Sequence, residues 1–351
     1  MCYSEDTIDV RPEERFDTVR LREYLKGSLE GTQNKLKVRQ FSGGAANLTY
    51  LLDYGTHEYV LRRPPLGPVA PTSHDMAREY RVLSILYKTF PCAPQAFLFC
   101  DDSKVIGASF FIMERKRGVV VRKTVPEVFV AMEDSPRRMS EALVDRLAEF
   151  HAVDFASLGL GDLGRPEGFI QRQVEGWFKR WEAAKHEDLE EMDDLYAWLT
   201  ENLPTVSDTA LVHNDYKLDN LMFSPTDPGH VVAIFDWDMC TLGDPLNDLG
   251  ALLCYWSEPS DPAFFKRASM MPTDVHFLTR EALVQRYAEK GTRNVTNIRF
   301  YHVLGLFRLI GIAAQIYIRF VRGQTKDARF AAFGDLIPLI SRYALSLIAK
   351  T

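Results

Sequence analysis

The chain has 351 residues, of which 46% are hydrophobic and 26% charged. At roughly 150 residues per domain, this is enough for a sizeable core and about two domains. The 42 lysines and arginines and 48 aspartates and glutamates give a net charge of -6, which excludes a basic protein that coats nucleic acid. The five cysteines form no Cys-x-x-Cys pair, which predicts reduced thiols and a cytoplasmic location rather than disulfides or a zinc site.

Neither a signal peptide nor a membrane span is expected. The N-terminal segment carries acidic residues and no apolar stretch, unlike a secretory signal. The most membrane-like stretch, residues 303–320, is interrupted by Arg308, Gln315 and Arg319. Such side chains are costly in a lipid bilayer, so we expect a packed helix and no membrane partner.

The first hundred residues are typical of a β-rich region. β-branched and aromatic residues alternate or cluster there, and turns that contain glycine separate the clusters. A proline-rich loop then leads to a helix predicted over residues 73–89, with Ser73 as its N-cap. Strands are expected over residues 35–41, 47–54, 58–62, 96–100 and 109–113.

After about residue 118, apolar residues recur at helical spacing. A short β-rich segment, residues 211–235, interrupts this helical part of the chain. The sequence therefore predicts an α+β protein with a small β-rich lobe over residues 1–117 and a large helical lobe over residues 118–351. Helices are expected over residues 139–151, 171–185 and 189–203.

The most informative residues lie in and after this β-rich segment. Asp215 and Asn220 are separated by four residues, and Asp236 follows the apolar run 231–235. A strand that ends in aspartate can direct a carboxylate at a cation, and Mg²⁺ typically binds one or two carboxylates together with substrate phosphates. Two carboxylates and an amide oxygen near one loop are the groups that phosphoryl transfer requires.

The pattern His213-x-Asp215-x-x-x-x-Asn220 followed by Asp236-x-Asp238 resembles the catalytic and metal-binding loops of protein-kinase-like enzymes. It is most similar to the branch of aminoglycoside phosphotransferases and choline kinases. Within that branch, it resembles the phosphotransferase-like domains that are fused to acyl-CoA dehydrogenases in some animal proteins. The expected fold is therefore protein-kinase-like, with two lobes.

The resemblance, which covers about residues 35–255, implies a role for most of these residues. Asp215 would be the catalytic base that accepts the proton of a substrate hydroxyl. Asn220 and Asp236 would hold Mg²⁺, which bridges the phosphates of ATP. His213 would support the loop, whereas Asp238 could equally be a structural hydrogen-bond acceptor or a support of the metal site.

A glycine-rich turn in the β-rich lobe could cover the phosphates. It contains Ser42, Gly43, Gly44 and Asn47 between two predicted strands. Small residues let backbone N–H groups approach phosphate oxygens. Two glycines in a turn are by themselves typical of an ordinary hairpin, so the prediction depends on the position of the turn in front of the strand pair.

The same resemblance implies a cation for the phosphates and an acid that orients it. Arg62 stands where most kinase-like proteins carry lysine, and strand alternation directs Arg63 to the opposite face. Glu79, on the predicted helix, would be the acid, although it could also be a solvated helix residue. Met113 and Glu114 would belong to the strand that enters the hinge, whose backbone would contact adenine.

Three further features have structural and functional interpretations. Asp244 and Asp248 are expected to anchor a loop and cap a helix that begins near Pro245. The acidic run 186–194 could attract a cationic substrate, but a solvated helix face is the favoured interpretation.

The third feature is a stripe on one predicted helix. Arg308, Gln315, Arg319 and Arg322 recur at a spacing that places them on one helix face. This stripe could hold an anionic substrate, or it could be the solvated face of an amphipathic helix.

These observations predict an ATP- and Mg²⁺-dependent enzyme that transfers a phosphoryl group to a hydroxyl of a small molecule. One alternative is a nucleotide-binding module without turnover, in which Arg62 marks the loss of activity. The other is a phosphatase similar to the haloacid dehalogenases, because Asp236-x-Asp238 also resembles their Asp-x-Asp motif. Residues 243–248 would then stand for the later acidic motif of that family. In that family, however, a large part of the domain separates the two motifs.

Overall fold

The structure is a computed structural model that describes residues 6–42, 47–66, 75–205, 208–325 and 327–349. The chain forms two compact units. The first unit comprises Met1–Arg117 and Val232–Met239, and the second comprises Gly118–Val231 and Cys240–Thr351. The break after Arg117 coincides with the predicted lobe boundary. The segment that contains Asp236, however, belongs to the first unit and not to the predicted C-terminal lobe.

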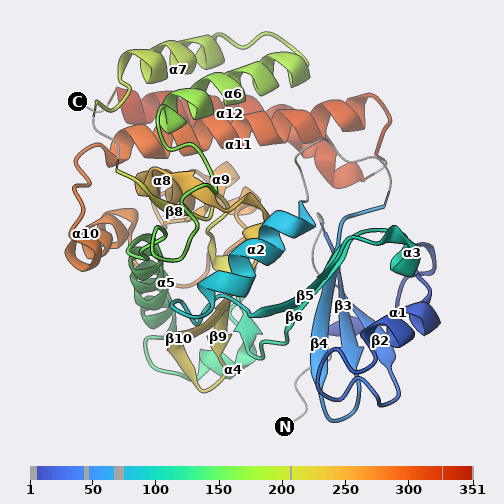
Figure 1. The fold of residues 1–351 in the computed structure, drawn as a ribbon. Helices are drawn as coiled ribbons and strands as arrows, with labels where there is room; N and C mark the ends of the chain where they lie inside the picture. The colour runs from blue at the N-terminus through green and yellow to red at the C-terminus, as the bar shows by residue number, and fades with distance from the viewer. Residues whose placement is uncertain (1–5, 43–46, 67–74, 206–207, 326, 350–351) are drawn as a thin grey trace. The chain divides into compact units, whose positions relative to one another are not determined.

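The first unit contains a six-stranded sheet with the strand order β1-β2-β3-β4-β6-β5 (Figure 1). All five pairings in it are antiparallel. The predicted strands are confirmed to within two residues at each end, but the short first strand was not predicted. The strands are β1 (Thr7–Ile8), β2 (Lys37–Phe41), β3 (Leu48–Asp53), β4 (Glu58–Arg63), β5 (Ala96–Cys100) and β6 (Phe110–Glu114).

Two helices of the first unit pack against this sheet. Helix α1 (Thr18–Leu25) buries Leu21 and Leu25 in a core with side chains of β3 and β4. Helix α2 (Met76–Leu86) packs against β5 and β6. The N-cap of α2 is Asp75, whose Oδ1 accepts from the Arg78 N–H at 3.0 Å. The prediction of Ser73 as the cap is therefore wrong, because a cap at residue 73 requires a helix that begins at residue 74, and α2 begins two residues later, at Met76. Ser73 itself lies outside the described residues.

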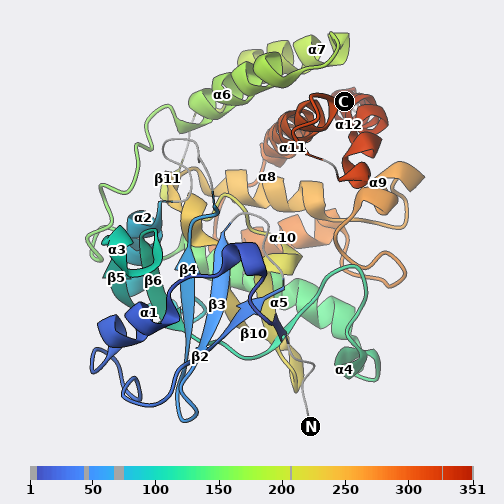
Figure 2. The ribbon, with the colours of Figure 1, turned by 90° about the vertical axis from the view of Figure 1, so that its right-hand side faces the viewer.

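The second unit is mainly helical, and its longest helix, α11, packs against α6, α8 and α12. Figure 1 and Figure 2 show α6 beside α7 and α11 beside α12. Gly305 permits the close approach of α11 to α8, because a Cβ atom there would lie 2.5 Å from Cys254 Sγ. The main helices are α5 (Ser135–His151), α6 (Phe169–Ala184), α7 (Glu190–Glu201), α8 (Pro245–Tyr255), α10 (Arg280–Gly291), α11 (Ile298–Val321) and α12 (Phe333–Ile348).

Short strands in the second unit flank the segment that contains Asp215. Strand β8 (Ala210–Val212) forms an antiparallel pair with β11 (Thr241–Gly243). Strand β9 (Leu221–Ser224) pairs with β7 (Val119–Val120), and β10 (Asp227–Ile234) lies on the other side of β9. The loop between β8 and β9 is therefore fixed at both ends.

Two helical segments, Ile298–Val321 and Ala328–Ile348, have the length and mean hydropathy of a membrane-spanning helix. Half of the most apolar window of the first segment is buried inside the protein, and 22% of that of the second. The first segment contains the stretch for which the sequence predicts a packed helix. Its packing against α6, α7, α8 and α12 agrees with that prediction.

Candidate active site

The predicted site residues are divided between the two units. Arg62, Glu79 and Asp236 belong to the first unit, whereas Asp215 and Asn220 belong to the second. We therefore describe the first group as the nucleotide half, and the second as the acceptor half, of the candidate site. Each half is built by the elements of its own unit.

In the nucleotide half, Arg62 of β4 joins two acidic residues that are distant in sequence. Its Nε donates to Glu79 Oε2 of α2 at 2.9 Å, and its Nη2 donates to Asp236 Oδ1. The side chain of Arg62 is 10% exposed and that of Glu79 is 2% exposed. Glu79 is therefore not a solvated helix residue. Strand alternation directs Arg63 elsewhere, where it donates to the Ile106 carbonyl at 3.1 Å.

The charges of this cluster act strongly on one another. Burial raises the pKa of Glu79 to about 7, although the Arg62 guanidinium opposes that rise. Burial lowers the pKa of Arg62, but the carboxylates of Glu79, Asp236 and Asp238 outweigh burial and raise it. One guanidinium thus stands among three carboxyl groups. With these groups ionised, the nucleotide half carries surplus negative charge, which suits a bound cation.

Asp236 and Asp238 follow β10 in a tight loop. Asp236 has a φ of 69°, a left-handed conformation that aspartate tolerates better than most residues. The indole N–H of Trp237 donates to the Ile234 carbonyl at 2.7 Å, which closes the loop. Asp238 Oδ2 accepts from Asn47 Nδ2 at 3.3 Å. This contact links the end of the predicted phosphate loop to the metal motif, a role for Asp238 that the sequence left open.

The other residues predicted to contact the nucleotide are only partly described. Gly43 and Gly44 lie outside the described residues. The exposed Ser42 accepts from Arg11 through its carbonyl at 3.5 Å. Met113 lies in the register of β6 opposite Val60. Glu114, the last residue of that strand, accepts from the Gln95 N–H at 3.2 Å, so its side chain holds the end of the strand.

In the acceptor half, Asp215 is surrounded by side chains of its own loop. Asn220 Nδ2 donates to Asp215 Oδ2 at 3.0 Å and to the Asp215 carbonyl at 2.8 Å. Lys217 Nζ binds both carboxylate oxygens, at 2.8 and 3.0 Å. Burial lowers the pKa of Lys217, but the carboxylates of Asp215 and Asp219 raise it above its usual value. Lys217 is a candidate site residue that the sequence analysis missed, although its position between Asp215 and Asn220 could have indicated it.

The loop that carries Asp215 is anchored from helix α8. Asp248 is fully buried, and its two oxygens accept from the backbone N–H groups of His213, at 2.5 Å, and Asn214, at 2.7 Å. Asn214 has a φ of 63°, and the Asp215 N–H then donates to His213 Nδ1 at 3.3 Å. Burial raises the pKa of Asp248, but hydrogen bonds from His151 and His213 hold it below its usual value. Asp248 thus anchors the loop, as predicted.

Asp244, the second acid predicted to be structural, caps helix α8. Its Oδ1 accepts from the Leu246 N–H at 2.9 Å, and its Oδ2 accepts from the Tyr301 hydroxyl at 2.6 Å. Pro245 is the first residue of the helix, a position where proline loses no hydrogen bond. The predicted cap and helix start are both confirmed.

Comparison with known proteins places the chain in a family. A model of the phosphotransferase enzyme family matches residues 37–272. The chain belongs to this family. It is 32% identical to acyl-CoA dehydrogenase family member 11 of Rattus norvegicus, in a match that covers all of this chain and 46% of that protein. The chain therefore spans about half the length of such relatives.

Solved structures of phosphotransferases share the fold. A crystal structure from Ralstonia eutropha, assigned by name to the aminoglycoside phosphotransferases, has a TM-score of 0.81 at 30% identity and covers 96% of this chain and 99% of its own. A thermostable mutant of aminoglycoside phosphotransferase APH(4)-Ia, in a ternary complex with AMP-PNP and hygromycin B, has a TM-score of 0.57 at 18% identity, with coverages of 90% and 96%. The predicted kinase-like α+β fold is confirmed. The haloacid-dehalogenase-like alternative is thereby excluded.

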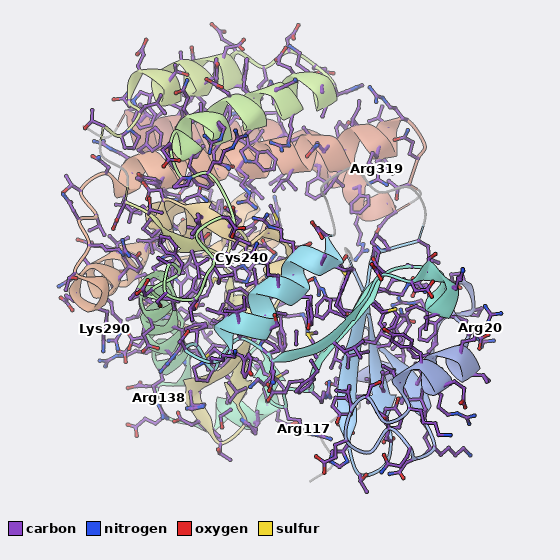
Figure 3. The ribbon with its side chains drawn as sticks, in the orientation of Figure 1. Arg20, Arg117, Arg138, Cys240, Lys290 and Arg319 are labelled. Atoms are coloured by element: carbon purple, nitrogen blue, oxygen red, sulfur yellow. The ribbon has the colours of Figure 1, made fainter. Side chains whose placement is uncertain are left out.

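The predicted arginine stripe does not form one continuous surface. Arg308 is buried, with its guanidinium 5.4 Å from the centre of the Trp177 ring. Gln315 and Arg319 are exposed, and Figure 3 shows Arg319 near the C-terminal end of α11. Arg322 is the C-cap of that helix. The residues keep their helical spacing, but Arg308 is buried whereas Gln315 and Arg319 are exposed.

The acidic run lies at the start of α7, in part beside a pocket. Glu190, Glu191 and Asp193 occupy the first helical turn, where the helix dipole favours negative charge. A pocket of about 280 Å³ lies between α6, α11 and α12. Glu187 and Asp188 are on its rim, and both are exposed. This arrangement agrees with a solvated acidic face.

Proposed function

We propose that the chain is a small-molecule kinase that transfers the γ-phosphoryl group of ATP to a hydroxyl group, with the help of Mg²⁺. Membership of the phosphotransferase family supports the reaction type. The relative with AMP-PNP bound supports a nucleoside triphosphate as the donor. The residues of the two halves support the individual steps.

The observation that carries this proposal is the contact of Arg62 with both Glu79 and Asp236. These three residues are the ones that the sequence predicts at the phosphates and the metal. A guanidinium that two carboxylates hold in place can present its remaining N–H groups to phosphate oxygens. A fold that only supported a packed core would have no need to bury such a charged cluster, which is costly.

The acceptor half supplies the group that would handle the proton. Asp215 would orient the acceptor hydroxyl and accept its proton as the new P–O bond forms and the bond to ADP breaks. Asn220 and Lys217 hold the carboxylate of Asp215 in one orientation.

Each half offers oxygen atoms of the kind that Mg²⁺ binds. Asp236 offers a carboxylate oxygen and Asn220 an amide oxygen, and Mg²⁺ binds such hard oxygen ligands together with phosphates and water. The surplus of carboxylates around Arg62 also favours a divalent cation. Within the described ranges, no group of three or more His, Cys, Asp or Glu side chains could hold a metal ion by itself. Bound Mg²⁺ would neutralise the charge of the phosphates.

The acceptor is a small molecule with a hydroxyl group. Aminoglycosides, hydroxy acids, choline-like alcohols and sugars all suit the residues of the two halves, because none of these residues selects among them. We also propose that the protein acts in a reducing cytoplasm without a membrane partner. In support, Cys92, Cys100, Cys240 and Cys254 are buried and belong to no disulfide, and α11 packs among other helices.

The experiment is a screen for ADP release in the presence of ATP and Mg²⁺ across these four acceptor classes. We expect one class to raise ADP release well above the rate with ATP alone, and the product to be a phosphate monoester. Asp215→Ala should abolish this increase while ATP still binds. The matched control is Asp227→Asn, because Asp227 forms an ion pair with Arg138 at the surface of the second unit. Retained turnover in Asp215→Ala would contradict the assignment, and ATP binding without product in the wild type would indicate a binding module instead.

A further inference from the structure

His151, the last residue of α5, is a buried histidine next to the acceptor half. Its side chain is fully buried. Its Nε2 lies 3.3 Å from Asp248 Oδ2, and its Nδ1 lies 2.7 Å from the hydroxyl of Tyr287 on α10. Both of these partners are also completely buried. The ring therefore joins three helices, α5, α8 and α10, through two hydrogen bonds.

The chemistry of the partners determines which ring nitrogen carries the proton. A carboxylate only accepts hydrogen bonds, so Nε2 must carry the hydrogen that Asp248 accepts. Burial lowers the pKa of His151, although Asp248 opposes that change, and a neutral ring has only one N–H group. Nδ1 must then accept from the Tyr287 hydroxyl. The Tyr287 hydroxyl thus selects the form of His151 that can donate to Asp248.

Asp248 connects this chain of hydrogen bonds to the base. Its Oδ2 accepts from both His151 Nε2 and the His213 N–H, and its other oxygen accepts from the Asn214 N–H. Asp215 is the next residue along the chain. A rotation of the Asp248 carboxylate would therefore move the backbone that directs Asp215.

Other charged groups near His151 also belong to the second unit. Arg293 Nη2 donates to the His151 carbonyl at 2.8 Å, and its charge lowers the pKa of the ring, whereas Asp244 raises it. On α10, Tyr287 has its pKa raised mainly by burial, so its hydroxyl keeps its proton. The network therefore has one arrangement of donors and acceptors: Tyr287 donates to His151, and His151 donates to Asp248.

We propose that His151 and Tyr287 are positioning residues for the catalytic loop: the Tyr287 hydroxyl and the His151 ring fix the orientation of Asp248, and through it that of Asp215. This inference rests on the proposed function, because its kinetic consequence requires Asp215 to act as the base. Neither side chain would touch ATP or the acceptor. Their loss should therefore lower kcat and leave the KM for ATP unchanged.

The test compares variants that keep or remove these hydrogen bonds. Tyr287→Phe removes one hydroxyl, and His151→Leu removes both bonds at similar volume. His151→Gln keeps an amide N–H for Asp248 and an amide oxygen for Tyr287. We expect kcat to fall about tenfold in Tyr287→Phe and about a hundredfold in His151→Leu, because small displacements of a catalytic group have effects of this size. His151→Gln should recover most of the loss.

The matched control is Tyr50→Phe in the first unit. Tyr50 is equally buried, and its hydroxyl donates to the Glu14 carbonyl at 2.8 Å, so this variant also removes one buried phenol hydrogen bond. It should leave kcat within twofold of the wild type. An equal fall of kcat in Tyr50→Phe and Tyr287→Phe, or a rise in the KM for ATP that accounts for the whole effect, would overturn the proposal.

A second measurement does not depend on turnover. In protein with ¹⁵N-labelled histidine, the wild type should show His151 as the Nε2–H form, and Tyr287→Phe should move both ring ¹⁵N shifts towards a mixture of the two neutral forms. The backbone amide signals of His213 and Asn214 should shift in the same variant. Unchanged ring and amide signals would overturn the inference. Absence of turnover in the wild type together with these shifts would instead contradict only the proposed function.

Discussion

In the nucleotide half, charged side chains bind one another directly: Arg62 holds the carboxylates of Glu79 and Asp236 in the first unit. The acceptor half is held differently, since Asp248 binds backbone N–H groups such as that of Asn214. The nucleotide half should therefore respond most to changes of charge. The acceptor half should respond most to changes of hydrogen-bond geometry that leave the fold intact.

The difference suits the two tasks in the proposed reaction. A nucleotide and a divalent cation bring several charges, which a cluster of charged side chains can balance when they bind. A general base depends mainly on its orientation, because its carboxylate must lie within hydrogen-bond distance of one hydroxyl proton. The following changes are ordered from the largest expected effect to the smallest.

The largest effect on turnover should come from replacing one carboxylate in each half, and the two replacements should differ in their effect on ATP binding. Asp215→Asn should lower kcat by about 10³-fold, since a general base contributes about 10² to 10⁴, and should leave ATP binding in place. Asp236→Asn should lower both turnover and the Mg²⁺ dependence of ATP binding. Binding is measured by calorimetry with and without Mg²⁺. If the two variants showed the same pattern, the division into halves would be wrong.

Removal of the Arg62 guanidinium should show how strongly the stability of the nucleotide half depends on charge. Arg62→Met leaves Glu79 buried without its guanidinium partner, which should lower the free energy of unfolding by about 3–5 kcal/mol. Chemical denaturation measures this change. The control is Arg117→Met, because the Arg117 side chain is 68% exposed in its ion pair with Glu58 and lies at the surface in Figure 3. It should cost less than about 1 kcal/mol.

A double variant sharpens this test. Arg62→Met with Glu79→Leu removes both charges of the buried pair, so it should recover part of the lost stability. If the double variant were less stable than Arg62→Met alone, the destabilisation would not come from an unpaired buried carboxylate.

A change of one atom should show how the acceptor half depends on geometry. Asp248→Asn replaces an accepting oxygen by an N–H group that faces the loop amides, so the loop must shift. A hydrogen bond to a charged group contributes about 1.5–3 kcal/mol, which corresponds to a fall of roughly 10- to 100-fold in kcat. Asp145→Asn is the matched control, since Asp145 of α5 binds Arg286 at 2.7 Å. Equal kcat values for the two variants would contradict the role of Asp248.

The smallest effect concerns acid stability, which should come from a neutral group of the second unit. Burial lowers the pKa of His302 to about 3, below the value of about 6.5 in an unfolded chain. The unfolded chain therefore binds more protons between these values, and the free energy of unfolding should fall as pH drops below about 6.5, by at most ~1.4 kcal/mol per pH unit. His302→Leu should flatten this slope in denaturation curves from pH 7 to 4. An unchanged slope would show that His302 is not responsible.

The sequence predicted more of the elements and the site than of the contacts between them. The five predicted strands of the first unit and helices α5, α6 and α7 follow from apolar periodicity, and Asp215, Asn220 and Asp236 follow from a motif of fixed spacing. The contact between Arg62 and Asp236 spans 174 positions, and a local pattern contains no information about such a distance. The predicted N-cap of α2 was wrong because Ser73 and Asp75, two residues apart, are both good N-cap residues. The residue at which the helix begins decides between them.

The remaining omissions, Lys217 and His151, have different physical causes. Lys217 was passed over because a lysine in a loop is usually solvated, and only the structure shows it bound to Asp215. His151 was assigned to the end of an apolar helix, and its partners Asp248 and Tyr287 come from elements that follow much later in the chain. Side chains whose role depends on buried partners from distant elements cannot be recognised from local sequence.

The most direct test of the central claim is transfer of label from ATP that carries ³²P in its γ-phosphoryl group. With the acceptor class found in the screen, we expect label to appear in the acceptor at a rate that requires Mg²⁺. Asp215→Asn should transfer about 10³-fold less at the same ATP occupancy. Label that appears only as inorganic phosphate, or transfer that is unchanged in Asp215→Asn, would contradict the proposed kinase.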